Sequence, residues 1–124
     1  SNFNLFSGAH NFKLVDNKGE KVTVGERGLL LYNEGTVCGD DEFNANAANT
    51  ICRKMGHSVA KNWGFGNKSE FQSNLTINLA GVNCIVNGSW SSCDYNSDNI
   101  TSCEHSQDVF LTCCGGTFFE KFKK

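Results

Sequence analysis

The sequence predicts a small disulfide-rich α+β domain with several short strands, one main helix and long loops. Two observations lead to this fold class: seven cysteines in 124 residues, and a single switch from alternating to helical hydrophobic spacing. No Cys-x-x-Cys pair occurs, which argues against a zinc ribbon or a thioredoxin-type site. Spread-out cysteines in a short chain are typical of a covalent framework formed in an oxidising compartment. They are Cys38, Cys52, Cys84, Cys93, Cys103, Cys113 and Cys114.

Short apolar segments predict strands in the first third of the chain. Phe12–Val15 leads into a turn signature, and Lys21–Val24 alternates polar and apolar side chains. Leu29–Tyr32 and Thr36–Cys38 flank Asn33-Glu34-Gly35, which predicts a hairpin.

The hydrophobic spacing then becomes helical. From Asn44 to Met55 the apolar residues form one stripe, which predicts a single amphipathic helix with Cys52 on its buried face. Gly56 suits a left-handed cap at its end, and the acidic run Asp40-Asp41-Glu42 lies at its N-terminal approach. The stripe consists of Ala47, Ala48, Ile51, Cys52 and Met55.

The second half of the chain is richer in loops. Residues 61–76, which include Trp63-Gly64-Phe65-Gly66, predict a long irregular loop. We expect a strand at Ile77–Cys84, a disulfide-tied loop over 85–107 and a closing strand at Asp108–Cys113.

Charge and composition exclude several function classes. The net charge is −2 and the sequence pI about 5.9, so nothing indicates a nucleic-acid partner. No run of eighteen apolar residues exists, so this segment is not expected to insert into a membrane. The chain opens without a signal peptide, and we expect it to be a mature or excised piece of a longer protein. That protein would be secreted or displayed on the extracellular face of a membrane.

Two motifs at the front and two at the rear carry a resemblance to a known family. Gly35-Thr36-Val37-Cys38 and Ala48–His57 resemble the first two signatures of a scavenger receptor cysteine-rich domain. Leu79–Cys84 and Cys103–Cys113 are similar to its rear signatures. The missing tryptophan before Gly35 marks a divergent member.

The resemblance implies a domain over residues 12–114, with a lead-in at 1–11 and a tail at 115–124. It also implies a curved antiparallel sheet that cradles the one main helix. The six-cysteine (group A) pattern of the family leaves Cys114 unpaired. Either Cys114 forms an intermolecular disulfide, or it is an idle thiol beside its neighbour. The pairs implied by the resemblance are Cys38–Cys103, Cys52–Cys113 and Cys84–Cys93.

The same resemblance implies a Ca²⁺ site, the one cofactor expected here, although none is required. Family members use aspartates after the first cysteine and a glutamate from the loop between the Cys84 and Cys93 positions. Asp40 and Asp41 match the aspartates, and Asn87 is the nearest oxygen donor in the loop. The alternative is that the acidic run only favours the N-terminal end of the helix.

Basic residues and histidines offer weaker candidates. A polyanion surface could form from the early basic residues together with the lysines of the tail, and the alternative is a solvated face. The three histidines accompany no nucleophile in a known order, so we expect no catalytic residue and no enzyme. The residues concerned are Lys13, Lys18, Lys21, Arg27, Lys121, Lys123, Lys124, His10, His57 and His105.

Four Asn-x-Ser/Thr acceptors suit the surface of a secreted glycoprotein, although several are expected by chance in so asparagine-rich a chain. They are Asn67, Asn74, Asn87 and Asn99.

The sequence thus predicts an extracellular ligand-recognition module. The resemblance implies protein, polyanionic or microbial-surface ligands in innate immunity or adhesion. The alternative is a structural adhesion or matrix-assembly module that forms homo-oligomers through Cys114 and the aromatic tail at 118–122. A small hydrolase or toxin is a lesser alternative, since it would need a perturbed acid or nucleophile in a cleft.

Overall fold

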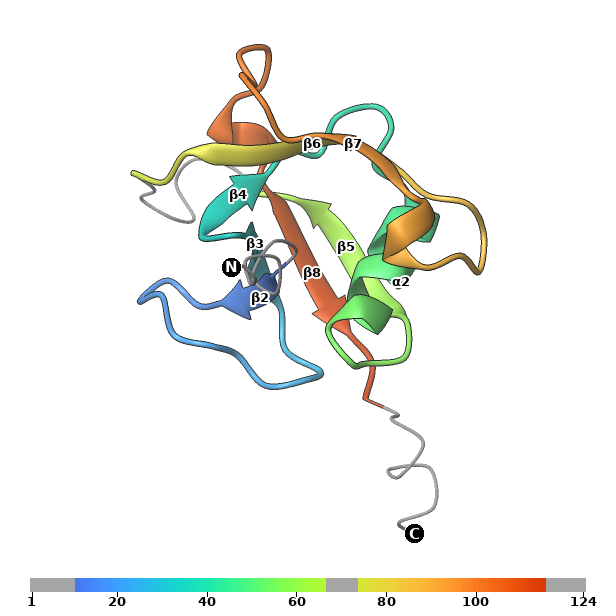
Figure 1. Ribbon diagram of the computed structural model, residues 1–124. Helices are drawn as coiled ribbons and strands as arrows, with labels where there is room; N and C mark the ends of the chain where they lie inside the picture. Colours follow the sequence, from blue (N-terminus) through green and yellow to red (C-terminus); the bar gives the residue numbers. More distant parts are fainter. Residues whose placement is uncertain (1–10, 67–73, 116–124) are drawn as a thin grey trace, which may run out of the picture.

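A seven-stranded sheet forms the body of the computed structural model, which describes residues 11–66 and 74–115 (Figure 1). The sheet order is β5-β8-β3-β4-β6-β7, and β2 pairs with β3 beside this path. The sheet curls around one helix, α2. The strands are β2 (Phe12–Val15), β3 (Gly28–Tyr32), β4 (Gly35–Val37), β5 (Ala60–Phe65), β6 (Ile77–Asn83), β7 (Asp94–Asn96) and β8 (Val109–Cys113).

All strand pairs of the described residues are antiparallel except β4 with β6, which run parallel. The chain leaves β4, passes through α2 and β5, and returns as β6, and a parallel pair needs such a long crossover connection. The predicted antiparallel sheet therefore contains one parallel pair.

Helix α2 spans Ala45–Lys54, as the apolar stripe predicts. Its N-cap is Asn44, whose Oδ1 accepts hydrogen bonds from the backbone N–H of Asn46 at 3.0 Å and of Ala47 at 3.2 Å. Gly56 has φ +93° just past the helix, the left-handed conformation that glycine adopts without strain. The predicted helix and its glycine cap are confirmed.

The β3–β4 hairpin is also confirmed, with Tyr32 opposite Gly35. Asn33 and Glu34 both have positive φ, 48° and 72°, which matches the twist of the flanking strands. The Asn78 side chain donates from Nδ2 to the carbonyl oxygens of Tyr32 and Asn33, which holds β6 to this turn.

Three sequence-based expectations were wrong. Residues 61–65 of the expected loop at 61–76 belong to strand β5, because they pair along β8, a contact that local sequence does not encode. Lys21–Val24 is not a strand, and only Lys21 makes a bridge, to Val15. The expected loop at 85–107 contains β7 and two short 3₁₀ turns, at Trp90–Ser92 and His105–Gln107.

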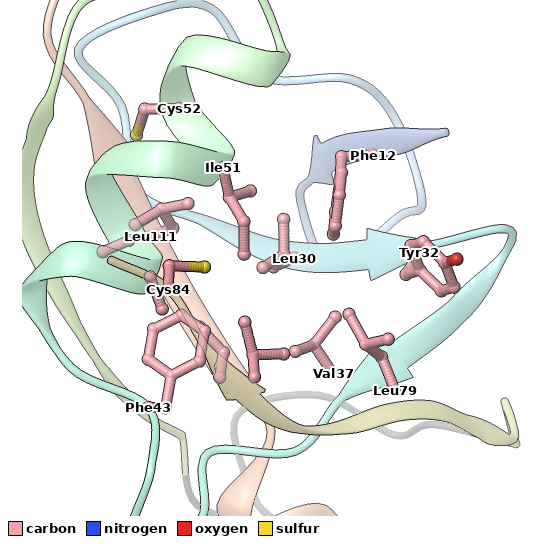
Figure 2. Close-up of a cluster of buried hydrophobic side chains, with 14 of the residues drawn as sticks. Phe12, Leu30, Tyr32, Val37, Phe43, Ile51, Cys52, Leu79, Cys84 and Leu111 are labelled. Carbon is pink, nitrogen blue, oxygen red and sulfur yellow. The ribbon is translucent and has the colours of Figure 1, made fainter. Parts of the chain in front are cut away.

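The main core lies between α2 and the concave face of the sheet. Ile51 of α2 points toward Leu30 of β3 and Leu111 of β8, and all three side chains are fully buried (Figure 2). A second, smaller cluster lies on the other face of the sheet and consists of Val15, Leu29, Leu31 and Phe110. No helix of the described residues is long and apolar enough to cross a membrane.

Three disulfides join segments that are far apart in the chain or close a loop. One joins α2 to β8, one joins the end of β4 to the segment after β7, and one closes the loop after β6. Their Cα–Cα distances are 5.7, 6.3 and 4.3 Å, respectively. The pairs are Cys52–Cys113, Cys38–Cys103 and Cys84–Cys93, the three that the family resemblance implies.

The contribution of each disulfide to stability should follow the length of the loop that it closes. Replacing Cys52 and Cys113 by alanine removes a bond between residues 61 positions apart. This change should lower the free energy of unfolding by at least about 4 kcal/mol. The same change at Cys84 and Cys93, nine residues apart, should cost about 3 kcal/mol. Urea denaturation without reductant measures both. A larger loss for the short loop would contradict this order.

Candidate functional site

The acidic loop before α2 is held to β6 by one carboxylate. Asp40 accepts from the backbone N–H of Gly81 through Oδ2 at 2.7 Å and from that of Glu42 through Oδ1 at 3.1 Å. Gly81 has φ +63°, so a glycine suits the position that presents this N–H. Asp40 thus has a structural contact that the sequence did not indicate.

The acidic run does not cap α2. The cap is Asn44, and no acidic residue lies in the first turn of the helix. Asp41 and Glu42 are exposed in the loop before the cap. The alternative interpretation, that the charge of this run favours the N-terminal end of the helix, stays a prediction, and Asp40 makes the loop contact in addition.

The residues proposed for Ca²⁺ lie in different surroundings. Asn87 lines a hollow together with Arg53 and Lys54, and neither Asp40 nor Asp41 lines it. The two cationic side chains oppose a metal ion at this position. Among residues 11–66 and 74–115, no group of three His, Cys, Asp or Glu side chains could hold a metal ion. The Ca²⁺ site stays a prediction.

The loop between Cys84 and Cys93 meets the last turn of α2. The Arg53 guanidinium donates from Nη2 to the carbonyl oxygen of Gly88 at 2.7 Å and to the Thr50 hydroxyl at 3.3 Å. The hollow between the two elements has a volume of about 340 Å³. It is lined by Thr50, Arg53, Lys54, Asn87, Gly88, Ser89 and Trp90.

Sequence reasoning missed this loop surface. No surface role was predicted for Arg53 and Lys54, nor for Ile85 and Val86, which are 61% and 67% exposed. The available signal was an apolar pair directly after the first cysteine of a short disulfide loop, where no core can cover it.

The expected basic surface is partly neutralised. Lys13 forms an ion pair with Glu34 at 3.0 Å, and the Arg27 guanidinium lies 4.2 Å from the centre of the Phe110 ring. Lys18 and Lys21 are exposed. The tail lysines lie outside the described residues.

The aromatic residues separate into two groups. Trp90 is buried, contacts Phe12 edge-on at 4.9 Å and stacks on Tyr95 at 4.9 Å, so it anchors its loop to the core. Trp63 and Phe65 are 38% and 46% exposed, with ring centres 5.9 Å apart, and form a small surface pair.

The buried carboxylate of Asp108 pairs with a histidine. His105 Nδ1 lies 3.0 Å from both carboxylate oxygens, in the turn that precedes β8. Burial raises the pKa of Asp108, while the Thr36 hydroxyl and the His105 ring partly lower it. His57 lines a separate small hollow beside Met55, and His10 lies outside the described residues.

The remaining candidates are surface features. Cys114 is half-buried and has no disulfide partner among the described residues, and its N–H donates to the carbonyl oxygen of Val59 at 2.8 Å. Asn74, Asn87 and Asn99 are exposed, which suits glycan acceptors, and Asn67 lies outside the described residues. Their glycosylation stays a prediction.

Comparison with known proteins gives one family. The family model described as "Scavenger receptor cysteine-rich domain" matches residues 19–114. Lysyl oxidase homolog 2 of Xenopus laevis is 39% identical over 101 residues, which cover 77% of this chain and 13% of that protein. The human protein of the same name is 35% identical, over 77% of this chain and 12% of its own length. The chain thus spans about an eighth of these relatives.

Two solved structures share the fold. The dimeric form of the SRCR domain of mouse MARCO is 30% identical, with a TM-score of 0.56, and the match covers 75% of this chain and 92% of that domain. The third SRCR domain of murine neurotrypsin has a TM-score of 0.59 at 23% identity, over 84% and 95%, and supports the fold alone.

Asp40 should matter to stability more than its acidic neighbour. Asp40→Ala removes the acceptor for two backbone N–H groups, and we expect a loss of about 2 kcal/mol in the free energy of unfolding. The exposed control Asp41→Ala should stay within about 0.5 kcal/mol. Urea unfolding of the oxidised chain measures both, and equal effects would contradict the assigned contact.

Asp108 should make stability depend on pH. Its pKa is raised above the ordinary 3.8, so the folded chain keeps a proton that the unfolded chain releases. Stability should therefore fall as the pH rises from that value through the raised pKa. Asp108→Asn removes this dependence, so its stability relative to the original chain should increase over this window. Thermal unfolding across a pH series, with Asp41→Asn as control, tests it; parallel curves would refute it.

Proposed function

Because this chain belongs to the scavenger receptor cysteine-rich family, we propose that it is a ligand-recognition module within a longer secreted or membrane-anchored protein. Domains of this family are extracellular, non-catalytic interaction modules. The chain covers about an eighth of its curated relatives, which supports a place beside other domains.

The observation that carries this proposal is the fixation of exposed loops by covalent bonds. The Cys84–Cys93 bond closes one loop, and the Cys38–Cys103 bond holds the segment after β7 to the end of β4. Side chains on such loops lose little conformational freedom on binding, so a larger part of the contact energy appears as affinity.

Protein ligands suit this surface better than polyanions. A polyanion needs a continuous basic stripe, and here the charge of Lys13 is paired with Glu34 while Arg27 lies over an aromatic ring. Lys18 and Lys21 remain as exposed cations, so polyanions and microbial surfaces are secondary ligands in this proposal. Assistance by Ca²⁺ remains a separate prediction.

A second candidate function is assembly. The mouse MARCO domain was solved in a dimeric form, and Cys114 of this chain is half-buried at the end of β8. We therefore keep homo-oligomerisation in adhesion or matrix assembly as the alternative role.

Binding by the oxidised chain tests the proposed function. Biolayer interferometry would measure the 124-residue chain against immobilised extracellular matrix proteins, heparin and lipopolysaccharide, in about 2 mM CaCl₂ or in EDTA. We expect binding to at least one protein by the oxidised chain and none by the reduced, alkylated control. Equal binding by both forms, or none by either, would contradict the proposal.

The same samples distinguish the alternative role. Light scattering after size exclusion should give a monomer for both the original chain and Cys114→Ser. A dimer that disappears in Cys114→Ser would favour assembly over monomeric recognition.

A further inference from the structure

The Cys84–Cys93 loop presents the two most exposed large hydrophobic side chains of the described residues. Ile85 and Val86 are 61% and 67% exposed, whereas the next most exposed, Phe65, is at 46%. Two adjacent aliphatic side chains this exposed contribute little hydrophobic stabilisation to the fold, and their burial against a partner would add to the free energy of binding.

This loop is held rigidly. The disulfide joins its ends, and the Gly88 N–H donates to the Ile85 carbonyl oxygen at 3.1 Å to form a turn. Gly88 lies so close to the Ile85 and Ser92 side chains that a Cβ there would collide with both. Buried Trp90 anchors the loop to the core. The apolar pair is therefore pre-organised for binding.

A positively charged hollow adjoins the apolar pair. Gly88 belongs to both, since it bonds to Ile85 and accepts from Arg53. The lining residues include Arg53 and Lys54 but no acidic side chain. Arg53 donates to Thr50 and Gly88 through Nη2, so its Nε and Nη1 hydrogens can meet a carboxylate. The C-terminal end of α2 adds roughly half a negative charge, which leaves the hollow positive overall.

We infer that Ile85, Val86 and the Arg53–Lys54 hollow form one docking surface for an extended segment of a partner protein. The segment would carry a carboxylate for the hollow and an aliphatic or aromatic side chain over Ile85 and Val86. In an extended chain, the side chains of residues i and i+2 point to the same side and lie about 7 Å apart. This spacing fits the distance across the single turn that joins the apolar pair to the hollow. This inference rests on the proposed function and specifies its ligand.

Two other ligand classes fit this surface less well. A polyanion would satisfy the hollow but leave the apolar pair in water. An anionic lipid surface could meet both the apolar pair and the hollow, but two adjacent aliphatic side chains offer little apolar area, and stable membrane binding takes a larger apolar face or a second anchor. A protein segment satisfies both the charge and the apolar contact.

A peptide-display experiment tests the inference. The oxidised 124-residue chain, produced without glycans, would select from random peptides of about twelve residues, a span of roughly 40 Å when extended. Enriched peptides should share Asp or Glu two positions from Leu, Ile, Val, Phe or Trp. One enriched peptide is then synthesised for affinity measurements.

Matched variants locate the binding surface. We expect Ile85→Ser with Val86→Ser to weaken binding of that peptide about tenfold, and Lys54→Glu about fivefold. The controls are Val59→Ser with Leu75→Ser, at 42% and 38% exposure, and Lys61→Glu, and these should change affinity less than about twofold. Thermal unfolding should change little in the variants of exposed apolar residues and in Lys61→Glu, whereas Lys54→Glu should lower the midpoint slightly, because it places a negative charge at the C-terminal end of α2.

Four outcomes would overturn the inference. They are failure to enrich any peptide, enrichment without the acidic–apolar pattern, equal binding by the Ile85/Val86 variant, and a glycan on Asn87 of the secreted chain, which would cover the hollow. Binding to phosphatidylserine–phosphatidylcholine vesicles that depends on Ile85 and Val86, without peptide binding, would assign the surface to lipid instead. The proposed function fails separately, if the oxidised and reduced chains bind the immobilised ligands equally or if neither form binds any of them.

Discussion

The covalent bond between Cys52 of α2 and Cys113 of β8 is the constraint on which the rest of the structure depends. Both sulfur atoms are buried, and the two residues stand 61 positions apart. A core built on so few side chains, such as Ile51, Leu30 and Leu111, offsets the chain entropy of a small domain only narrowly. Because the bond removes part of that entropy from the unfolded chain, the helix can stay against the sheet while the connecting loops remain long.

Strand β8 transmits this constraint to the surface. It pairs with β3 on one side and β5 on the other. The turn before it brings Asp108 against His105 and the end of β4. The Cys38–Cys103 bond then fixes the segment before that turn. Loops that would otherwise need their own hydrophobic anchors are held by bonds to the central strands. The outward side chains of these loops are therefore not needed for packing and can contact other molecules.

How much could be predicted from the sequence depended on the range of the interaction. The helix followed from the local stripe Ala47–Met55, and the β3–β4 hairpin from Asn33-Glu34-Gly35, since neighbouring residues encode both. Strand β5 was missed because Gly64 interrupts its pattern and its strand partner among the described residues is β8, about fifty residues later. The contact of Asp40 was also missed because its partner is distant in the sequence. The donor is the backbone N–H of Gly81, and the sequence does not show which backbone groups a side chain will meet.

The hollow beside the Cys84–Cys93 loop carries positive charge where the family resemblance implies a bound cation. The family resemblance places a cation ligand in this loop, yet here the loop has no acidic residue between its cysteines. The backbone carbonyl of Gly88 is occupied by Arg53, and Lys54 stands beside it. Two positive side chains in the lining of the hollow make a bound cation there unfavourable unless other ligands outweigh their repulsion. The same two charges favour a carboxylate, so the loop of this chain suits an anionic group at the position where the family resemblance implies a cation.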